Sequence, residues 1–214
     1  MPLSFNRGAP YAFYEEPTVA SFINIHGEDP RNLPISDKRW VEHCGSYVTL
    51  FLREVRALLD EQPGRDLAVI FNTALFGSTD PAEVHKYYFD VDGWIEESLV
   101  DVLMPTKSVD TRWLQQWRAS SGAKLKIWPD LRPRTMPGDY YVRLAQRYYE
   151  AGADGFCFWD GERRPPRISE WATARYLGHR DCLDDLELEA KGHFHRHQLD
   201  TLNGLAVPLS FRDG

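Results

Sequence analysis

Carboxylate side chains follow two of the short apolar segments that the sequence predicts to be strands. Asp130 comes directly after KLKIWP, and Asp160 closes the segment FCFWD. Two carboxylates that flank a bond can act as general acid and base, as glycoside hydrolysis requires, and their separation decides between retention and inversion. We therefore predict Asp160 and Asp130 as catalytic residues. Asp160 is the first choice because it closes a buried strand and follows a tryptophan.

Each carboxylate also has a structural interpretation. Asp160 could cap the turn that follows it, or pair with Arg163 or Arg164. Asp130 could be a turn residue after Pro129, and for this position the structural interpretation is the stronger one. The sequence leaves both alternatives open.

Polar and aromatic residues gather at the predicted carboxyl ends of strands, where ligands bind in parallel α/β folds. We expect substrate-binding side chains there: Asn6, Arg7, Asn72, Trp128, Trp159 and Glu162. An indole is a flat apolar platform with a polar edge, and a guanidinium offers a planar fork to a carboxylate or to hydroxyls. Each has an alternative: the tryptophans could be packing at the mouth of the fold, Arg7 could hold its loop, and Asn72 could satisfy turn backbone.

Histidine and cysteine usage gives little support for a metal or a cofactor. His193, His195 and His197 would share one face of a strand, but they lack a fourth ligand at a familiar spacing. The three cysteines have no metal-type spacing and imply no disulfide framework. We expect no metal, no cofactor, and a packing role for Cys157.

The segment from Asp139 to Asp160 shows the predicted fold most clearly, because it contains a helix followed by a strand. Tyr140, Leu144 and Tyr148 recur at helical spacing, and a Gly-bounded apolar run then indicates a strand buried on both faces. Predicted strands and helices alternate along the rest of the chain. Predicted strands cover 3–6, 67–71, 100–104, 124–128 and 156–159, with Pro105 and Thr106 closing the third. Predicted helices cover 17–25, 37–61, 91–98, 110–120, 139–150 and 168–177.

Strand–helix alternation predicts an α/β fold with a parallel sheet of about five strands. Such a sheet is either doubly wound or part of a barrel, since a closed barrel needs eight strands. The residues after Asp181 form an acidic linker and a β-hairpin around Asn203-Gly204, a strong turn dipeptide. We therefore divide the chain into residues 1–181 and a C-terminal tail, 182–214.

Net charge and hydropathy indicate which binding partners and which cellular compartment to expect. The 214 residues carry a formal net charge of −7, which argues against nucleic acid because phosphate binding favours a basic surface. No stretch approaches the length of a membrane span, and the start lacks the basic and apolar regions of a signal peptide. As written the chain reads as cytoplasmic, and secretion is expected instead if the true N-terminus lies upstream.

Four segments together resemble a known family. They are VDGWIEESLVDVLMPT (91–106), KLKIWPDLRP (124–133), AGADGFCFWD (151–160) and WATARYLGHRD (171–181). They are similar to segments of bacterial glycosyl-hydrolase-like TIM-barrel proteins. The resemblance implies a partial (β/α)8 barrel in which MPLSFNR ends the fourth strand and the AGADG segment leads into the eighth.

The same resemblance implies that the chain acts on carbohydrate, or binds it, at the carboxyl ends of the barrel strands. Two departures stand against full activity: the first three barrel strands are absent, and Ser4 stands where related proteins carry a carboxylate. The alternatives are a non-catalytic carbohydrate-binding or scaffold protein, and a truncated inactive fragment that forms a homodimer through its open sheet edge.

Overall fold

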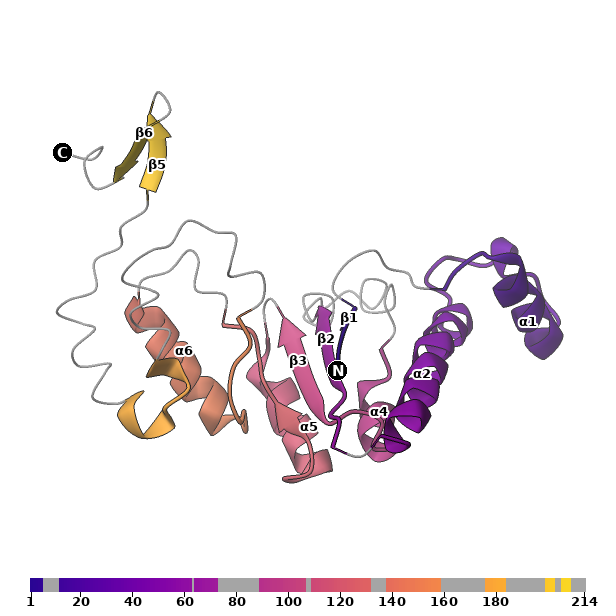
Figure 1. Cartoon of the computed structure of the whole chain (residues 1–214). Helices are drawn as coiled ribbons and strands as arrows, with labels where there is room; N and C mark the ends of the chain where they lie inside the picture. Colours follow the sequence, from indigo (N-terminus) through magenta and orange to yellow (C-terminus); the bar gives the residue numbers. More distant parts are fainter. Residues whose placement is uncertain are drawn as a thin grey trace. The chain divides into compact units, whose positions relative to one another are not determined.

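The structure, a computed structural model, describes residues 1–5, 12–62, 64–72, 89–106, 109–131, 138–158, 176–183, 199–202 and 205–208 (Figure 1). The chain divides into two compact units, Met1–Ile127 and Trp128–Gly214. Each unit is described by itself.

A parallel sheet forms the centre of the first unit. Its strands lie in the order β1 (Pro2–Phe5), β2 (Ala68–Asn72), β3 (Val102–Thr106) and β4 (Lys126–Ile127), and every neighbouring pair is parallel. The arrows of β1, β2 and β3 point the same way in Figure 1, so their carboxyl ends share one edge of the sheet. The predicted α/β class with a parallel sheet is confirmed.

Strand order in space follows strand order in sequence, with the helices α2 (Lys38–Asp60), α4 (Val91–Glu96) and α5 (Thr111–Ser121) in the connections. Right-handed crossovers between successive neighbours place such helices on one face. Ring contacts agree with this: the Phe71 centroid lies 6.3 Å from Trp94 of α4 and 5.8 Å from Trp117 of α5. A doubly wound sheet reverses its direction at a switch point, and the described strands do not reverse.

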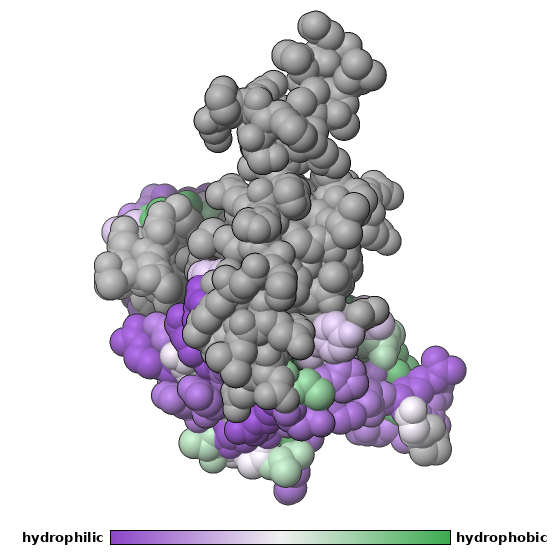
Figure 2. All heavy atoms as spheres, turned by 90° about the vertical axis from the view of Figure 1, so that its left-hand side faces the viewer, coloured by the Kyte–Doolittle hydropathy of each residue, from purple (hydrophilic) through white to green (hydrophobic). Residues whose placement is uncertain are grey.

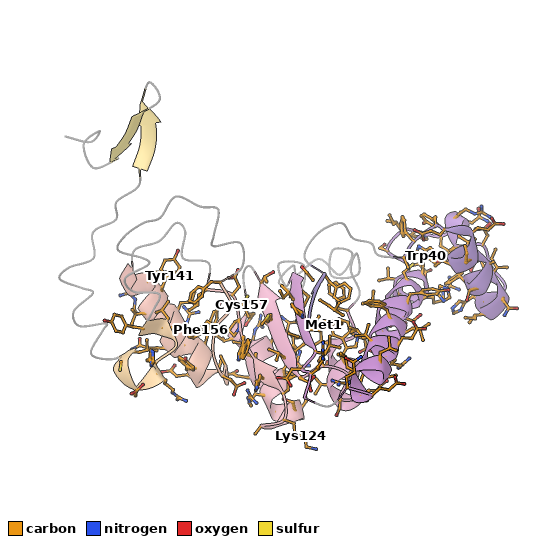
Figure 3. The ribbon with its side chains drawn as sticks, viewed as in Figure 1. Met1, Trp40, Lys124, Tyr141, Phe156 and Cys157 are labelled. Atoms are coloured by element: carbon orange, nitrogen blue, oxygen red, sulfur yellow. The ribbon has the colours of Figure 1, made fainter. Side chains whose placement is uncertain are left out.

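Helix α2 corresponds to the helix predicted at 37–61. The Asp37 side chain caps it by accepting a hydrogen bond from the Arg39 backbone N–H, and Leu52 is fully buried. The shorter helix α1 (Glu16–His26) packs on its N-terminal part, with a 3₁₀ turn, η1 (Pro30–Asn32), in the connection. Trp40 of α2 is the centre of that contact, with the ring of Phe22 edge-on at 5.2 Å (Figure 3).

Two polar contacts tie the helices to one another and to the sheet. The Trp94 indole N–H donates to the Thr49 hydroxyl at 3.0 Å, which joins α4 to α2 in the core. Asp101 accepts from the Arg56 guanidinium at 2.7 Å and from the Leu67 backbone N–H at 2.6 Å. Asp101 therefore links α2 to the start of two neighbouring strands.

The second unit contains α6 (Gly138–Glu150), a 3₁₀ turn, η4 (Arg180–Cys182), and two antiparallel strands, β5 (Leu199–Leu202) and β6 (Leu205–Pro208). Leu202 pairs with Leu205, so the predicted hairpin around Asn203-Gly204 is confirmed. The Tyr149 hydroxyl of α6 donates to the Leu177 carbonyl at 3.2 Å, which fixes the segment before η4 against the helix.

Two sequence predictions need correction. Pro105 and Thr106 are the last two residues of β3, whereas the sequence placed them just after the strand. Pairing between β3 and β4 ends at Leu103 and Ile127, so the missing N–H of Pro105 interrupts no bond of that ladder. The predicted strand at 156–159 is described as an isolated parallel bridge between Cys157 and Asp130, and residues 156–158 are partly exposed rather than buried on both faces.

Several predictions fall outside the described residues. Of the helix predicted at 168–177 only Tyr176 and Leu177 are described, and they are helical; of the acidic linker only the residues up to Leu183 are described. On the face drawn in Figure 2, the described residues present a mainly hydrophilic surface with isolated hydrophobic side chains. None of the described helices has the length and apolar composition needed to cross a bilayer.

Replacing Trp94 by Phe should lower the free energy of unfolding by about 1–3 kcal/mol, because it removes the indole donor and leaves the buried Thr49 hydroxyl without it. Thr49→Val tests the other partner. Chemical denaturation of the two single variants and the double variant should give a double loss smaller than the sum. Strict additivity would contradict a direct Trp94–Thr49 bond.

Acidification should weaken the α1–α2 contact through His43. Burial lowers the pKa of His43 from its ordinary value, the His26 charge lowers it further, and a hydrogen bond to the Thr18 carbonyl at 3.1 Å opposes both. A lowered pKa means that the unfolded chain binds the proton first, so stability is present above about pH 6.5 and is lost as the pH falls.

His43→Gln should therefore show a smaller drop in the free energy of unfolding between about pH 7.5 and 5.5 than the unmodified chain. His179→Gln, at an exposed position, is the matched control and should keep the parent's pH dependence. Equal pH slopes for His43→Gln and the parent would rule out the contribution of His43.

Candidate functional site

The carboxyl ends of β1, β2 and β3 lie at one edge of the sheet and are polar at two of the three strands. Asn72 ends β2 and pairs with Thr106, the last residue of β3. The Thr106 hydroxyl is fully buried and donates to the Phe71 carbonyl at 3.1 Å, so it holds the two strands together at this edge. The described residues of these three strands include no carboxylate.

A tryptophan lies directly after β4 and packs on a glycine of the second unit. A Cβ atom placed on Gly155 would meet Cδ1 and Nε1 of Trp128, both at 3.4 Å. The indole therefore rests against the backbone at Gly155, and Trp128 remains partly exposed. An aromatic ring that packs on backbone at one side and is partly exposed can serve as a stacking platform.

Asp130 lies two residues beyond Trp128 and is held by backbone pairing. The Leu131 N–H donates to the Cys157 carbonyl and the Cys157 N–H donates to the Pro129 carbonyl, each at 3.1 Å. These bonds place Asp130 opposite Cys157 in the parallel bridge, so the residue is in an extended segment and not in a turn. Asp130 is only 2% exposed, which separates its carboxylate from bulk solvent.

Two ionisable groups, the partly buried Cys157 and the buried Tyr148, share the surroundings of Asp130. Burial raises the pKa of the Cys157 thiol to about 12, with the Asp130 charge as a second cause. Burial likewise raises the pKa of Tyr148, and Tyr140 and Asp130 add to that rise. Thiol and phenol therefore stay protonated at neutral pH, which suits the packing role predicted for Cys157 and gives neither group the character of a nucleophile.

Two surface cavities lie elsewhere, in the first unit. One, of about 400 Å³, is lined by Tyr14, Glu16, Val19, Ala20, Ile23 and Arg31, where α1 meets η1. Arg31 is already paired there with Asp29. The other, of about 150 Å³, is lined by Phe5, Ala12, Tyr47, Val48 and Phe51. Neither cavity includes a residue that the sequence predicted for the site.

Of the predicted site residues, the structure describes Trp128 and Asp130 with their side chains and Asn72 by its backbone. The others lie outside the described residues: Asn6, Arg7, Trp159, Asp160 and Glu162, as do His193, His195 and His197. Across the described ranges, no group of three or more His, Cys, Asp or Glu side chains is arranged to hold a metal ion.

Sequence reasoning missed Gly155, Thr106 and Tyr148. A glycine just before an apolar run signals close approach of another group to the backbone, so Gly155 could have been found. No local pattern predicts the contact of Thr106, because its partner Phe71 lies 35 residues away in the sequence. Helical spacing places Tyr148 on a helix, but it does not predict that Asp130, from another segment, lies near its phenol. Comparison of the sequence with protein-family models and with curated proteins finds no match.

Gly155→Val should displace the Trp128 indole, because its branched side chain would occupy the space where the ring contacts the backbone. We expect a loss of about 1–3 kcal/mol in the free energy of unfolding and a changed near-ultraviolet dichroism. Gly178→Ala, at an exposed site with nothing within 4 Å of the added Cβ, is the matched control.

The same Gly155→Val change in a Trp128→Phe background tests whether the Trp128 ring causes the change in near-ultraviolet dichroism. The spectral change should largely disappear there, because the displaced chromophore is gone. A spectral change of equal size in both backgrounds would show that Gly155 does not position Trp128.

Proposed function

We propose that this chain is a glycoside-hydrolase-like α/β protein that binds carbohydrate at the carboxyl ends of its parallel strands. The observation that carries the proposal is the partly exposed Trp128 packed against Gly155, directly after β4. Sugar rings bury their C–H faces on such indoles while their hydroxyls bond to polar neighbours. The sequence predicts Asn6, Arg7, Asn72, Trp159 and Glu162 as further substrate-binding residues.

The strand order supports a finer proposal for the fold. Strands β1 to β4 follow one another in one direction, with α2, α4 and α5 in the crossovers between them. Successive (β/α)8 barrel units have this arrangement. We propose that the first unit corresponds to consecutive units of such a barrel, in line with the resemblance of its sequence to glycosyl-hydrolase-like proteins.

Binding is better supported than hydrolysis. Hydrolysis needs two carboxylates that reach the substrate, at about 5–9.5 Å from one another. Asp130 is 2% exposed, Ser4 stands on β1, and no described residue at the ends of β1 to β3 is acidic. A hydrolytic role therefore depends on Asp160, with Asp130 as its partner, and stays the second proposal.

Carbohydrate binding can be tested by titration calorimetry with a panel of neutral oligosaccharides: cellohexaose, xylohexaose, maltohexaose and chitohexaose. We expect one of them to bind, and Trp128→Ala to weaken that binding at least tenfold, about 1.4 kcal/mol, since the stacking surface is lost. Trp113→Ala, which removes a partly exposed tryptophan from α5, is the matched control and should leave affinity unchanged.

Release of reducing ends from the bound oligosaccharide separates the two proposals. If hydrolysis occurs, Asp160→Asn should reduce its rate at least a hundredfold while binding persists. If none of the oligosaccharides binds, or if Trp128→Ala binds as the parent does, the proposed carbohydrate site is wrong.

A further inference from the structure

Helix α1 lies on the side of α2 that faces away from the sheet (Figure 1). Its main contacts are with α2 and with the η1 turn. Val19 and Phe22 of α1 are buried together with Trp40 and Cys44 of α2, and these four residues form the cap cluster. If α1 moved away, the cap cluster would meet solvent while the sheet kept its covering helices.

The cap cluster contains a polar group whose hydrogen bond is not made. The Trp40 indole is fully buried, and its N–H has no acceptor among the described residues. A buried donor of this kind has lost its bond to water without receiving another in exchange. Water would supply the acceptor if α1 moved away, so desolvation of this N–H opposes the docking of α1.

Two histidines flank Phe22 in the same contact. The centroid of the Phe22 ring lies 4.3 Å from that of His26 on α1 and 5.4 Å from that of His43 on α2. His43 Nε2 also lies 3.1 Å from the Thr18 carbonyl oxygen, so the imidazole bonds to the backbone of α1. Histidines are the side chains that gain charge between about pH 8 and 5. Protonation of both would place like charges on either side of one buried ring, where water screens them less.

The carboxylates around this contact are engaged elsewhere. The Phe13 backbone N–H donates to Glu15 at 2.6 Å and holds the pKa of Glu15 below its ordinary value, so Glu15 stays ionised in this pH range. Its charge acts on Cys44, whose pKa burial raises to about 12. Other charged residues of α2, of η1 and of the connection form ion pairs: Glu42 with Lys38, Asp29 with Arg31, and Glu28 and Asp37 with Arg39.

Protonation of His43 favours the form in which α1 is released. Burial lowers the pKa of His43 and the His26 charge lowers it further, against the opposing effect of the Thr18 bond. Release of α1 restores the ordinary pKa of about 6.5, so the released form binds the proton more readily. Its population therefore grows as the pH falls. One such histidine can raise that population at most about tenfold between about pH 7.5 and 5.5.

We propose that α1 and η1 form a cap on α2 that opens as the pH falls, when His43 is protonated beside His26. The open form exposes the cap cluster, including the Cys44 thiol, while the four-stranded sheet and its helices stay folded. Local openings of this kind need less free energy than global unfolding, because fewer residues take part.

Thiol labelling measures the opening, because Cys44 is buried in the cap cluster and Cys182 is exposed. Mass spectrometry after reaction with dithiodipyridine gives the labelling rate of Cys44 divided by that of Cys182, a ratio that cancels the pH dependence of the reagent. We expect this ratio to rise about three- to tenfold from about pH 7.5 to 5.5.

The rise should fall below about twofold in His43→Gln, which keeps a donor for the Thr18 carbonyl but cannot take up the proton. His26→Gln removes the second charge and should give a rise smaller than that of the parent. It also tests the proposal if His43→Gln does not fold. His179→Gln, at an exposed position, is the matched control and should keep the full rise.

Hydrogen exchange separates opening of the cap from global unfolding. Amides of α1 should exchange at least about a hundredfold faster than those of β2 and β3, after correction for intrinsic rates. Trp94→Phe, which weakens the core by removing the bond to Thr49, should leave the labelling ratio unchanged.

Three results would each overturn the proposal. They are a labelling ratio that does not change with pH, an equal rise in the parent and in both histidine variants, and α1 amides as well protected as those of β2 and β3. The carbohydrate titrations are independent of these measurements, so either proposal can fail alone.

Discussion

Burial of the helix-facing side of the sheet is the constraint on which the first unit depends. Parallel ladders are stable when helices cover them, and here Phe71 projects from β2 into a cluster with Trp94 and Trp117. The indole of Trp94 also needs a partner for its N–H, which Thr49 of α2 supplies. One buried contact region therefore orients three helices and keeps the strands in register. The carboxyl edge, where β2 and β3 end in Asn72 and Thr106, is a consequence of that packing.

In the second unit, Gly155 and Asp130 take part in the contacts that hold the segments around residues 128–131 and 155–157 together. Gly155 lets the Trp128 ring lie against the backbone, and the bonds between residues 129–131 and Cys157 hold Asp130 inside. Trp128 and Asp130 are two residues apart, but Trp128 is partly exposed and Asp130 is buried. That difference is the reason why binding is the stronger functional proposal and why hydrolysis depends on residues beyond Asp130.

The edge of β1 and the outer face of α2 have no role in either proposed carbohydrate contact. Leu50, Phe51 and Leu58 of α2 are exposed, and Ser4 of β1 is exposed as well. Proteins usually cover or blunt such edges, and Pro2 blunts this one only in part, since Ser4 keeps its donor and acceptor outward.

Local patterns in the sequence determined most of the elements. The sequence predicted a helix at 37–61, which the structure has as α2, and Asn203-Gly204 predicted the hairpin, because each of these depends on neighbours within a few residues. Tertiary structure alone decided the rest. Pro105 lies inside β3 because the β3–β4 ladder ends before it, and Asp130 is buried in a bridge because Cys157, far along the chain, supplies the hydrogen bonds. Strand order and the contact between Trp128 and Gly155 also arise from residues distant in sequence, and no local pattern encodes which of them meet.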